Sequence, residues 1–123
     1  MAKVLVVDDT PSIRFLIRTN LELAGFDVVE AADGDECLRL VSTERPDLIT
    51  IDAVMPHRDG FSAVRALRAD AGTASLPIVM VSTQAQAADL KRGSEAGADA
   101  YLTKPFDPDE LIELIESLLA PPA

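Results

Sequence analysis

The stretch VLVVDD, residues 4–9, joins four aliphatic side chains to two adjacent carboxylates. Uninterrupted aliphatic runs of this kind are typical of strands in a parallel sheet, which helices cover on both faces. Strand-like runs recur at 48–51, 78–81 and 101–103, and the residues that follow them are Asp52, Ser82 and Lys104. The ligand site of an open parallel sheet lies outside the carboxyl ends of its strands. We therefore expect the acidic pair and these three side chains to meet at one edge of a sheet.

Segments with helical periodicity alternate with strands five times along the chain. The expected strands cover residues 3–7, 27–31, 48–51, 78–81 and 100–103. The expected helices cover about 11–24, a segment from 33, about 60–70, about 85–95 and a segment from 107. Such alternation favours right-handed crossovers, and hence an α/β fold built on a parallel sheet.

Capping signals support the helix boundaries. Thr10 is the expected N-cap of the first helix, with Pro11 at the first helical position and Gly25 past the end. Asp33 and Glu36 are spaced like a capping box at the start of the second helix.

The fourth helix carries the weakest signals. Its glycine, Gly93, costs about 1 kcal/mol relative to alanine. Leu90 is its only large aliphatic residue, so the helix is expected to bury little apolar area. Low local stability is typical of elements that move in a switch, and we expect this helix and its flanking loops to be mobile.

Composition limits the possible functions. With 123 residues, 48% of them apolar, the chain is expected to form one domain with a core over about 2–119. Residues 120–123 are then a short tail or the start of a linker. The net charge of −10 argues against direct binding of nucleic acid, which needs a basic surface. No apolar run reaches the roughly 20 residues of a membrane-spanning helix. Cys37, the only cysteine, excludes an internal disulfide and fits a cytoplasmic location.

The expected convergence of Asp8, Asp9 and Asp52 indicates a metal site. Three close carboxylates repel one another, and a hard divalent ion such as Mg²⁺ resolves that repulsion with oxygen ligands. A carboxylate such as Asp52 can also act as a nucleophile and form an aspartyl phosphate. Local structure offers alternatives: Asp52 could cap the next turn, and the acidic pair could satisfy donors at a helix N-terminus.

Ser82 and Lys104 fit phosphoryl chemistry, which needs positioning and charge neutralisation. A hydroxyl and an ammonium beside a bound cation would balance the phosphoryl oxygens. Pro105 follows Lys104, and a proline there can hold a cis bond in a tight turn, which would aim the ammonium back over the sheet edge. Alternatively, Ser82 merely ends a strand and Lys104 is a solvated surface lysine.

Taken together, these motifs resemble those of a response-regulator receiver domain of bacterial two-component signalling. The resemblance covers about 2–119 and includes intervals of 30 residues from Asp52 to Ser82 and 52 from Asp52 to Lys104. The matching residues are Asp8-Asp9, Asp52 with Met55-Pro56 and Asp59-Gly60, Ser82, and Lys104-Pro105-Phe106. This family implies a flavodoxin-like (βα)5 three-layer sandwich, with a five-stranded parallel sheet of order 2-1-3-4-5.

The resemblance also implies a role for each matching residue. Asp52 would be the phosphoacceptor, and Ser82 and Lys104 would contact the phosphoryl group. Mg²⁺ would bind Asp9, Asp52 and the backbone carbonyl of Val54, with Asp8 acting through water. Tyr101 matches an aromatic switch that is coupled to the Ser82 hydroxyl, although it could simply be an amphipathic side chain at the sheet edge.

The implied partners are proteins. A histidine kinase or a histidine phosphotransfer protein would donate the phosphoryl group, and a downstream target would bind the fourth helix, fifth strand and fifth helix. Neither nucleic acid nor a membrane is an expected direct partner. The chain would catalyse only its own phosphorylation and dephosphorylation, as a monomer or a weak phosphorylation-dependent dimer. The expected kinase-docking residues ring the site and are Pro11, Ser12, Ile13, Leu16, Pro105 and Phe106.

Some positions depart from the commonest pattern of the family or carry no firm role. Thr83 follows the switch hydroxyl, where a small residue is usual, and its bulk could narrow access to the phosphoryl group. Val54 and Gln84 occupy positions that modulate phosphoryl lifetime in this family. His57, the only histidine, is expected to be exposed in a loop.

Three other functions compete with this one. A phosphatase of the haloacid-dehalogenase type also uses an aspartate and Mg²⁺, but it needs an Asp-x-Asp pattern that Asp8-Asp9-Thr10 lacks. Flavin binding on the same fold needs a first loop rich in serine, threonine and glycine, and an acidic pair would repel the flavin phosphate. A receiver-like domain that no longer takes phosphate is disfavoured by the intact set of site residues.

Overall fold

The computed structural model describes residues 2–84 and 86–120. Its five strands form one parallel sheet of order β2-β1-β3-β4-β5, which confirms the expected fold. In chain order the elements are β1 (Lys3–Val7), α1 (Pro11–Leu23), β2 (Asp27–Ala31), α2 (Gly34–Glu44), β3 (Leu48–Ile51), α3 (Gly60–Ala69), β4 (Ile78–Ser82), α4 (Ala87–Ala96), β5 (Ala100–Thr103) and α5 (Pro108–Leu119).

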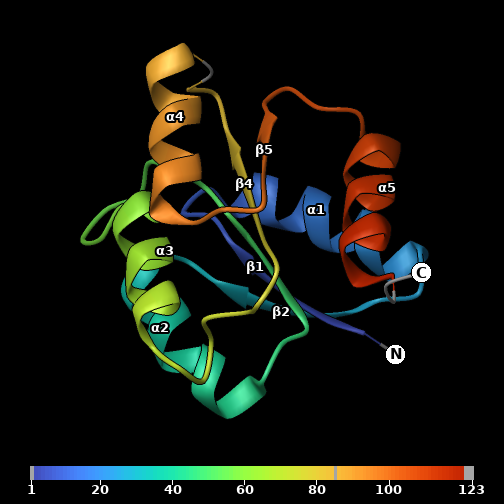
Figure 1. Ribbon diagram of the computed structural model, residues 1–123. Coiled ribbons are helices and arrows are strands. Elements are labelled where there is room, and N and C mark those ends of the chain that lie inside the picture. The colour runs from blue at the N-terminus through green and yellow to red at the C-terminus, as the bar shows by residue number, and fades with distance from the viewer. Residues whose placement is uncertain (1, 85, 121–123) are drawn as a thin grey trace.

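Helices cover both faces of the sheet (Figure 1). Alternate residues of the strands point to opposite faces, so the aliphatic runs supply two cores. Leu5 and Ile49 pack with α2, α3 and α4 on one face, whereas Val4 and Val79 pack with α1 and α5 on the other. The central strands are therefore buried on both sides, which explains their lack of polar alternation.

Most helix ends agree with the capping signals. The Asp33 carboxylate accepts the Glu36 N–H at the start of α2, at 2.8 Å. The reciprocal bond of a capping box is shifted by one residue, because the Glu36 carboxylate accepts from the Ala32 N–H. The C-terminus of α1 leads into Gly25, whose φ of 98° lies in the left-handed region that favours glycine.

The boundary at Thr10 is confirmed, whereas the start of the fourth helix needs correction. Thr10 is the N-cap of α1 and has the extended backbone typical of that position, although its side chain makes no capping bond. Its own N–H donates to the Asp8 carboxylate. The fourth helix begins at Ala87 after Gln86, whose N–H donates to the Asp89 carboxylate. The expected start at residue 85 lies outside the described residues, as do residues 121–123 of the expected tail.

The described helices are short. None of those within 2–84 and 86–120 combines the length and apolar character that crossing a membrane requires.

Candidate functional site

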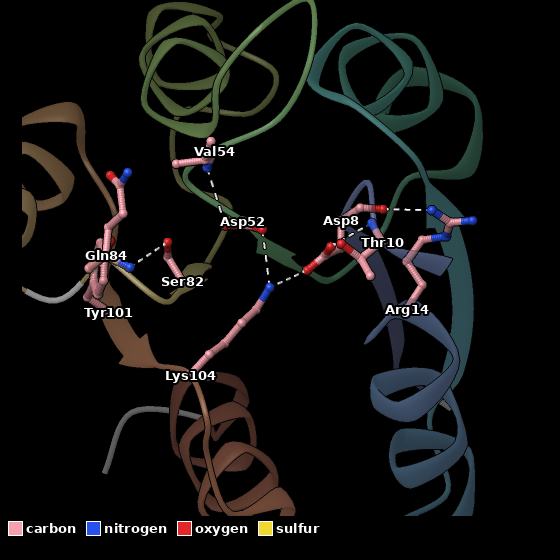
Figure 2. A network of polar contacts seen from close by, with 9 residues as sticks. All are labelled: Asp8, Thr10, Arg14, Asp52, Val54, Ser82, Gln84, Tyr101 and Lys104. Carbon is pink, nitrogen blue, oxygen red and sulfur yellow. Dashed lines mark hydrogen bonds and ion pairs between the residues drawn. The ribbon is translucent and has the colours of Figure 1, made fainter. Parts of the chain in front are cut away.

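The carboxyl ends of four strands carry the polar residues that the sequence singled out (Figure 2). Asp8 directly follows β1 and Asp52 directly follows β3, and the two strands pair with Val7 opposite Ile51. Ser82 ends β4, and Lys104 directly follows β5. The register of the parallel strands thus brings together groups that lie up to 96 residues apart in sequence.

Three carboxylates form the acidic part of the site. One oxygen each from Asp8, Asp9 and Asp52 lies within 4.8 Å of the other two. Asp8 and Asp52 are buried, with 1% and 9% of their surface exposed, whereas Asp9 is exposed. Oxygen donors at this spacing, one of them open to solvent, fit the preference of Mg²⁺ for carboxylates and water.

In each of the two buried carboxylates, one oxygen accepts a hydrogen bond from a nearby backbone N–H. Asp8 Oδ1 accepts the Thr10 N–H at 2.9 Å, and Asp52 Oδ1 accepts the Val54 N–H at 3.2 Å. These are the turn-capping bonds that the sequence offered as alternatives, and they coexist with the acidic cluster. Among residues 2–84 and 86–120, no hydrogen bond reaches the Asp9 carboxylate, so this group remains available to a ligand.

Lys104 supplies the positive charge of the site. Its Nζ lies 2.7 Å from Asp8 Oδ2 and 3.1 Å from Asp52 Oδ2, so it bridges the two buried acids. Burial alone would lower the pKa of the Lys104 ammonium, but the contacts with Asp8 and Asp52 outweigh it and raise the pKa above its ordinary value. The Lys104–Pro105 peptide bond is cis, as the sequence allowed.

Ser82 is connected to Tyr101 through the backbone of Gln84 (Figure 2). The Gln84 N–H donates to Ser82 Oγ at 3.1 Å, and the Tyr101 hydroxyl donates to the Gln84 carbonyl. Burial raises the pKa of the Tyr101 hydroxyl. One peptide segment therefore holds both side chains that the sequence assigned to the switch.

The loop after Asp52 is shaped by Gly60. A Cβ at position 60 would lie 2.1 Å from the Asp52 carbonyl oxygen, so only glycine fits beside the strand end. Val54 and His57 lie on this loop and are exposed. The structure therefore agrees with the expected exposure of His57, and the metal-binding role of the Val54 carbonyl stays a prediction.

Three of the expected docking residues contribute least to the core: Pro11, Ser12 and Pro105 are exposed. Leu16 is 44% exposed, whereas Ile13 and Phe106 are partly buried against the core that α1 and α5 form with the sheet. None of the three large apolar candidates, Ile13, Leu16 and Phe106, is fully buried, and only Leu16 is exposed.

Sequence reasoning missed two residues of α1. Phe15, the neighbour of Leu16, is 69% exposed, and its position outside the periodicity of the buried Ile17 and Leu21 was the available signal. Arg14 donates to the Asp8 carbonyl, and a bond to a backbone oxygen leaves no signal in the sequence.

Comparison with known proteins gives one consistent result. The family model described as the response regulator receiver domain matches residues 4–116. The chemotaxis protein CheY4 of Vibrio cholerae has a similar structure, with a TM-score of 0.92, 39% identity and coverage of 97% of this chain and 99% of that chain. The receiver domain of sensor histidine kinase PA1611 from Pseudomonas aeruginosa, solved with a magnesium ion in its active site cleft, gives a TM-score of 0.90, 31% identity and coverage of 96% and 97%.

A longer relative is the DNA-binding dual master transcriptional regulator RpaA of Synechocystis. It is 42% identical over 97% of this chain and 49% of its own length. The chain thus spans about half the length of several curated relatives that it matches.

Proposed function

The chain belongs to the response regulator receiver domain family, and from this premise we propose that it is a signalling switch phosphorylated on Asp52. The donor would be the phosphohistidine of a histidine kinase or of a histidine phosphotransfer protein. The observation that carries this proposal is the convergence of Asp8, Asp9 and Asp52, with the ammonium of Lys104 bridging Asp8 and Asp52.

The chemistry requires one substitution at phosphorus. A carboxylate oxygen of Asp52 forms the new O–P bond while the P–N bond of the phosphohistidine breaks. The electron pair of the broken bond goes to the imidazole nitrogen, which takes a proton from solvent. Lys104 and Ser82 would then contact the phosphoryl oxygens, because they lie at the same edge as Asp52. Apart from this transfer and the later hydrolysis of the aspartyl phosphate, in which water takes up the phosphoryl group and releases inorganic phosphate and free Asp52, we propose no enzymatic activity.

Mg²⁺ would be held by Asp9, Asp52 and the Val54 carbonyl, with Asp8 acting through water. When bound, it neutralises the negative charge that gathers between the carboxylates and the phosphoryl oxygens. The oxygen donors within 4.8 Å of one another support this assignment, as does the magnesium site of the similar PA1611 receiver domain.

The signal would leave through α4, β5 and α5, where a downstream protein binds. If the Ser82 hydroxyl turns toward the phosphoryl group, the Gln84 N–H loses its acceptor, and the Gln84 carbonyl no longer holds Tyr101 in place. Phosphorylation shifts this equilibrium only by its differential contacts with the two states, here the bonds of Ser82 and Lys104. Amide exchange with and without beryllofluoride tests this step, and changes confined to the Asp52 loop, without any in α4 or β5, would contradict it.

The remaining properties follow from this role. We propose that the protein is cytoplasmic, because its single cysteine, the buried Cys37, is a free thiol and needs no oxidising compartment. We also propose that it is a monomer or dimerises weakly when phosphorylated. Direct contact of this chain with nucleic acid is not proposed, since its net charge of −10 would repel a phosphate backbone.

Intact-mass measurement after incubation with acetyl phosphate and Mg²⁺ tests the central claim. The wild type should gain one phosphoryl group, and Asp52→Asn should gain none. Asp27→Asn is the matched control, because Asp27 is an exposed acid at the opposite end of β2 and should leave labelling unchanged. Equal labelling of Asp52→Asn and wild type would refute Asp52 as the acceptor.

A further inference from the structure

Arg14, in the first turn of α1, contacts the main chain of the acidic pair. Its Nη1 donates to the Asp8 carbonyl oxygen at 2.7 Å, as Figure 2 shows. The N–H on the other side of Asp8 donates to the Ala31 carbonyl at 3.1 Å. The backbone of Asp8 is therefore held from both directions, by β2 on one side and by a side chain of α1 on the other.

This contact bears on Asp9 more than on Asp8. The Asp8 carbonyl and the Asp9 nitrogen belong to one rigid peptide plane, so a bond to the carbonyl also fixes the direction in which the chain enters Asp9. Within the described residues, the Asp9 carboxylate has no hydrogen bond that could fix it independently. The geometry of this exposed acid consequently depends on the peptide plane that Arg14 holds.

The guanidinium of Arg14 is itself fixed. Its Nε donates to Glu30 Oε1 at 3.2 Å, and the second oxygen of Glu30 accepts from Arg18 Nη1 at 2.7 Å. Bonds from Arg18, with a smaller contribution from Arg14, lower the pKa of Glu30 despite its partial burial. Only 19% of the Arg14 side chain is exposed, and its hydrogen bonds connect α1 with β2 and with the end of β1.

We propose that Arg14 is a positioning residue, which sets the geometry of Asp9 for a divalent cation through the Asp8 carbonyl, with Glu30 as its anchor. This inference rests on the proposed function, because it concerns the Mg²⁺ site of the phosphorylation reaction. Partners of this indirect kind typically contribute roughly ten- to a hundredfold to metal affinity.

The charge of Arg14 and its positioning role are expected to have opposite effects on Mg²⁺ affinity. A guanidinium close to a cation site repels the cation, so removal of its charge should strengthen Mg²⁺ binding if Coulomb forces alone operated. Loss of positioning should weaken Mg²⁺ binding. The sign of the change in affinity therefore separates the two effects.

The experiment compares Arg14→Gln, Arg14→Lys and Arg18→Gln with the wild type by Mg²⁺ titration and by amide spectra of the metal-free proteins. Arg14→Gln should lose about tenfold or more in Mg²⁺ affinity. Arg14→Lys should also lose affinity, because an ammonium keeps the charge but lacks the planar fork that holds Asp8 and Glu30 together. Arg18→Gln removes a cation from the same network without touching Asp8, and its affinity should stay within about twofold of wild type.

The metal-free amide signal of Asp9 provides a second readout. It should shift in both Arg14 variants and stay in place in Arg18→Gln, while melting curves verify that all variants are folded. Unchanged or stronger Mg²⁺ binding by Arg14→Gln would overturn the proposal. Should the wild type itself bind no Mg²⁺, the metal assignment of the proposed function fails, and an unshifted Asp9 signal would then overturn the role of Arg14 separately.

Discussion

The ring of Tyr101 packs directly over Gly93 of α4. A Cβ at position 93 would lie 2.9 Å from Tyr101 Cδ2 and 3.3 Å from the sulfur of Met80. The sequence suggested only that this glycine weakens the helix. Its absent side chain also makes room for the aromatic ring, so the helix and the ring share one packing contact.

Gly93→Ala should therefore destabilise the protein, although alanine favours a helix by about 1 kcal/mol. We expect a net loss of about 1 kcal/mol, because overpacking of a full site outweighs helix propensity. In a Tyr101→Ala background the same change should stabilise by about 1 kcal/mol. Urea unfolding of the four proteins measures both effects, and an equal gain in the two backgrounds would disprove the packing argument.

Lys104→Met should leave Asp8 and Asp52 as uncompensated buried charges. Loss of one partner of a buried ion pair costs about 3–5 kcal/mol, so we expect a loss near 3 kcal/mol at neutral pH without Mg²⁺. Added Mg²⁺ should raise the melting temperature of this variant more than that of the wild type, because it restores the missing positive charge. Lys91→Met is the control, since Lys91 is 77% exposed, and equal Mg²⁺ shifts in variant and wild type would contradict the prediction.

Thr50→Val should stabilise the fold. Thr50 is buried in β3 between Val6 and Val79 of the neighbouring strands, and its Oγ1 has no hydrogen-bond partner among the described residues. A buried unsatisfied hydroxyl costs about 1–3 kcal/mol, and valine has nearly the same shape. Thr50→Ser keeps the hydroxyl and should not stabilise, and a Thr50→Val protein that unfolds at lower urea would show that the hydroxyl is satisfied in solution.

Stability should fall in alkaline solution through Cys37. Burial raises the pKa of this thiol from its ordinary 9.0 to about 12. Above pH 9.0 the unfolded thiol loses its proton while the folded one keeps it, so the native state becomes less favoured as pH rises. The slope should approach about 1.4 kcal/mol per pH unit.

Cys37→Ala should flatten this slope between pH 9 and 10, below the ordinary pKa values of Tyr101 and Lys104, which are 10.0 and 10.5. Urea unfolding at closely spaced pH values gives the comparison. Parallel pH profiles of the wild type and Cys37→Ala would rule out the thiol as the source.

Docking of the phosphodonor should depend on the exposed apolar side chains of Phe15 and Leu16 in α1. A phosphotransfer protein that labels the wild type should label Phe15→Ser and Leu16→Ser about tenfold more slowly. This corresponds to a loss of about 1.4 kcal/mol of docking free energy. Labelling by acetyl phosphate should stay unchanged, because this small donor needs no docking. Leu23→Ser is the control, since Leu23 is 82% exposed at the far end of the same helix. Equal slowing by all three variants would argue against a localised docking site.

The sequence predicted the sheet and the meeting of its polar ends because parallel strands impose both. Aliphatic runs reveal buried strands, and strand direction then places Asp8, Asp52, Ser82 and Lys104 at one edge. Residue types at those ends were sufficient to suggest phosphoryl chemistry.

The features that the sequence did not predict depend on contacts that leave no periodic pattern of residue types along the chain. Thr10 is the N-cap of α1 as expected, but the sequence did not reveal that its side chain makes no capping bond or that its N–H donates to the Asp8 carboxylate, two residues earlier. The bond from Arg14 to a main-chain carbonyl is likewise invisible in residue types. Gly93 resembled a defect of the helix because its partner, Tyr101, lies on a different element.

Tyr101 is the only tyrosine of a chain that has no tryptophan. The ultraviolet emission of the native protein therefore comes essentially from one ring, which lies over Gly93 with its hydroxyl on the Gln84 carbonyl. Transfer of the ring to other surroundings changes its quantum yield, so the chain carries its own optical reporter between the Gln84 carbonyl and α4. If phosphorylation moves this ring as proposed, activation of the unlabelled protein should be visible as a change in its own fluorescence.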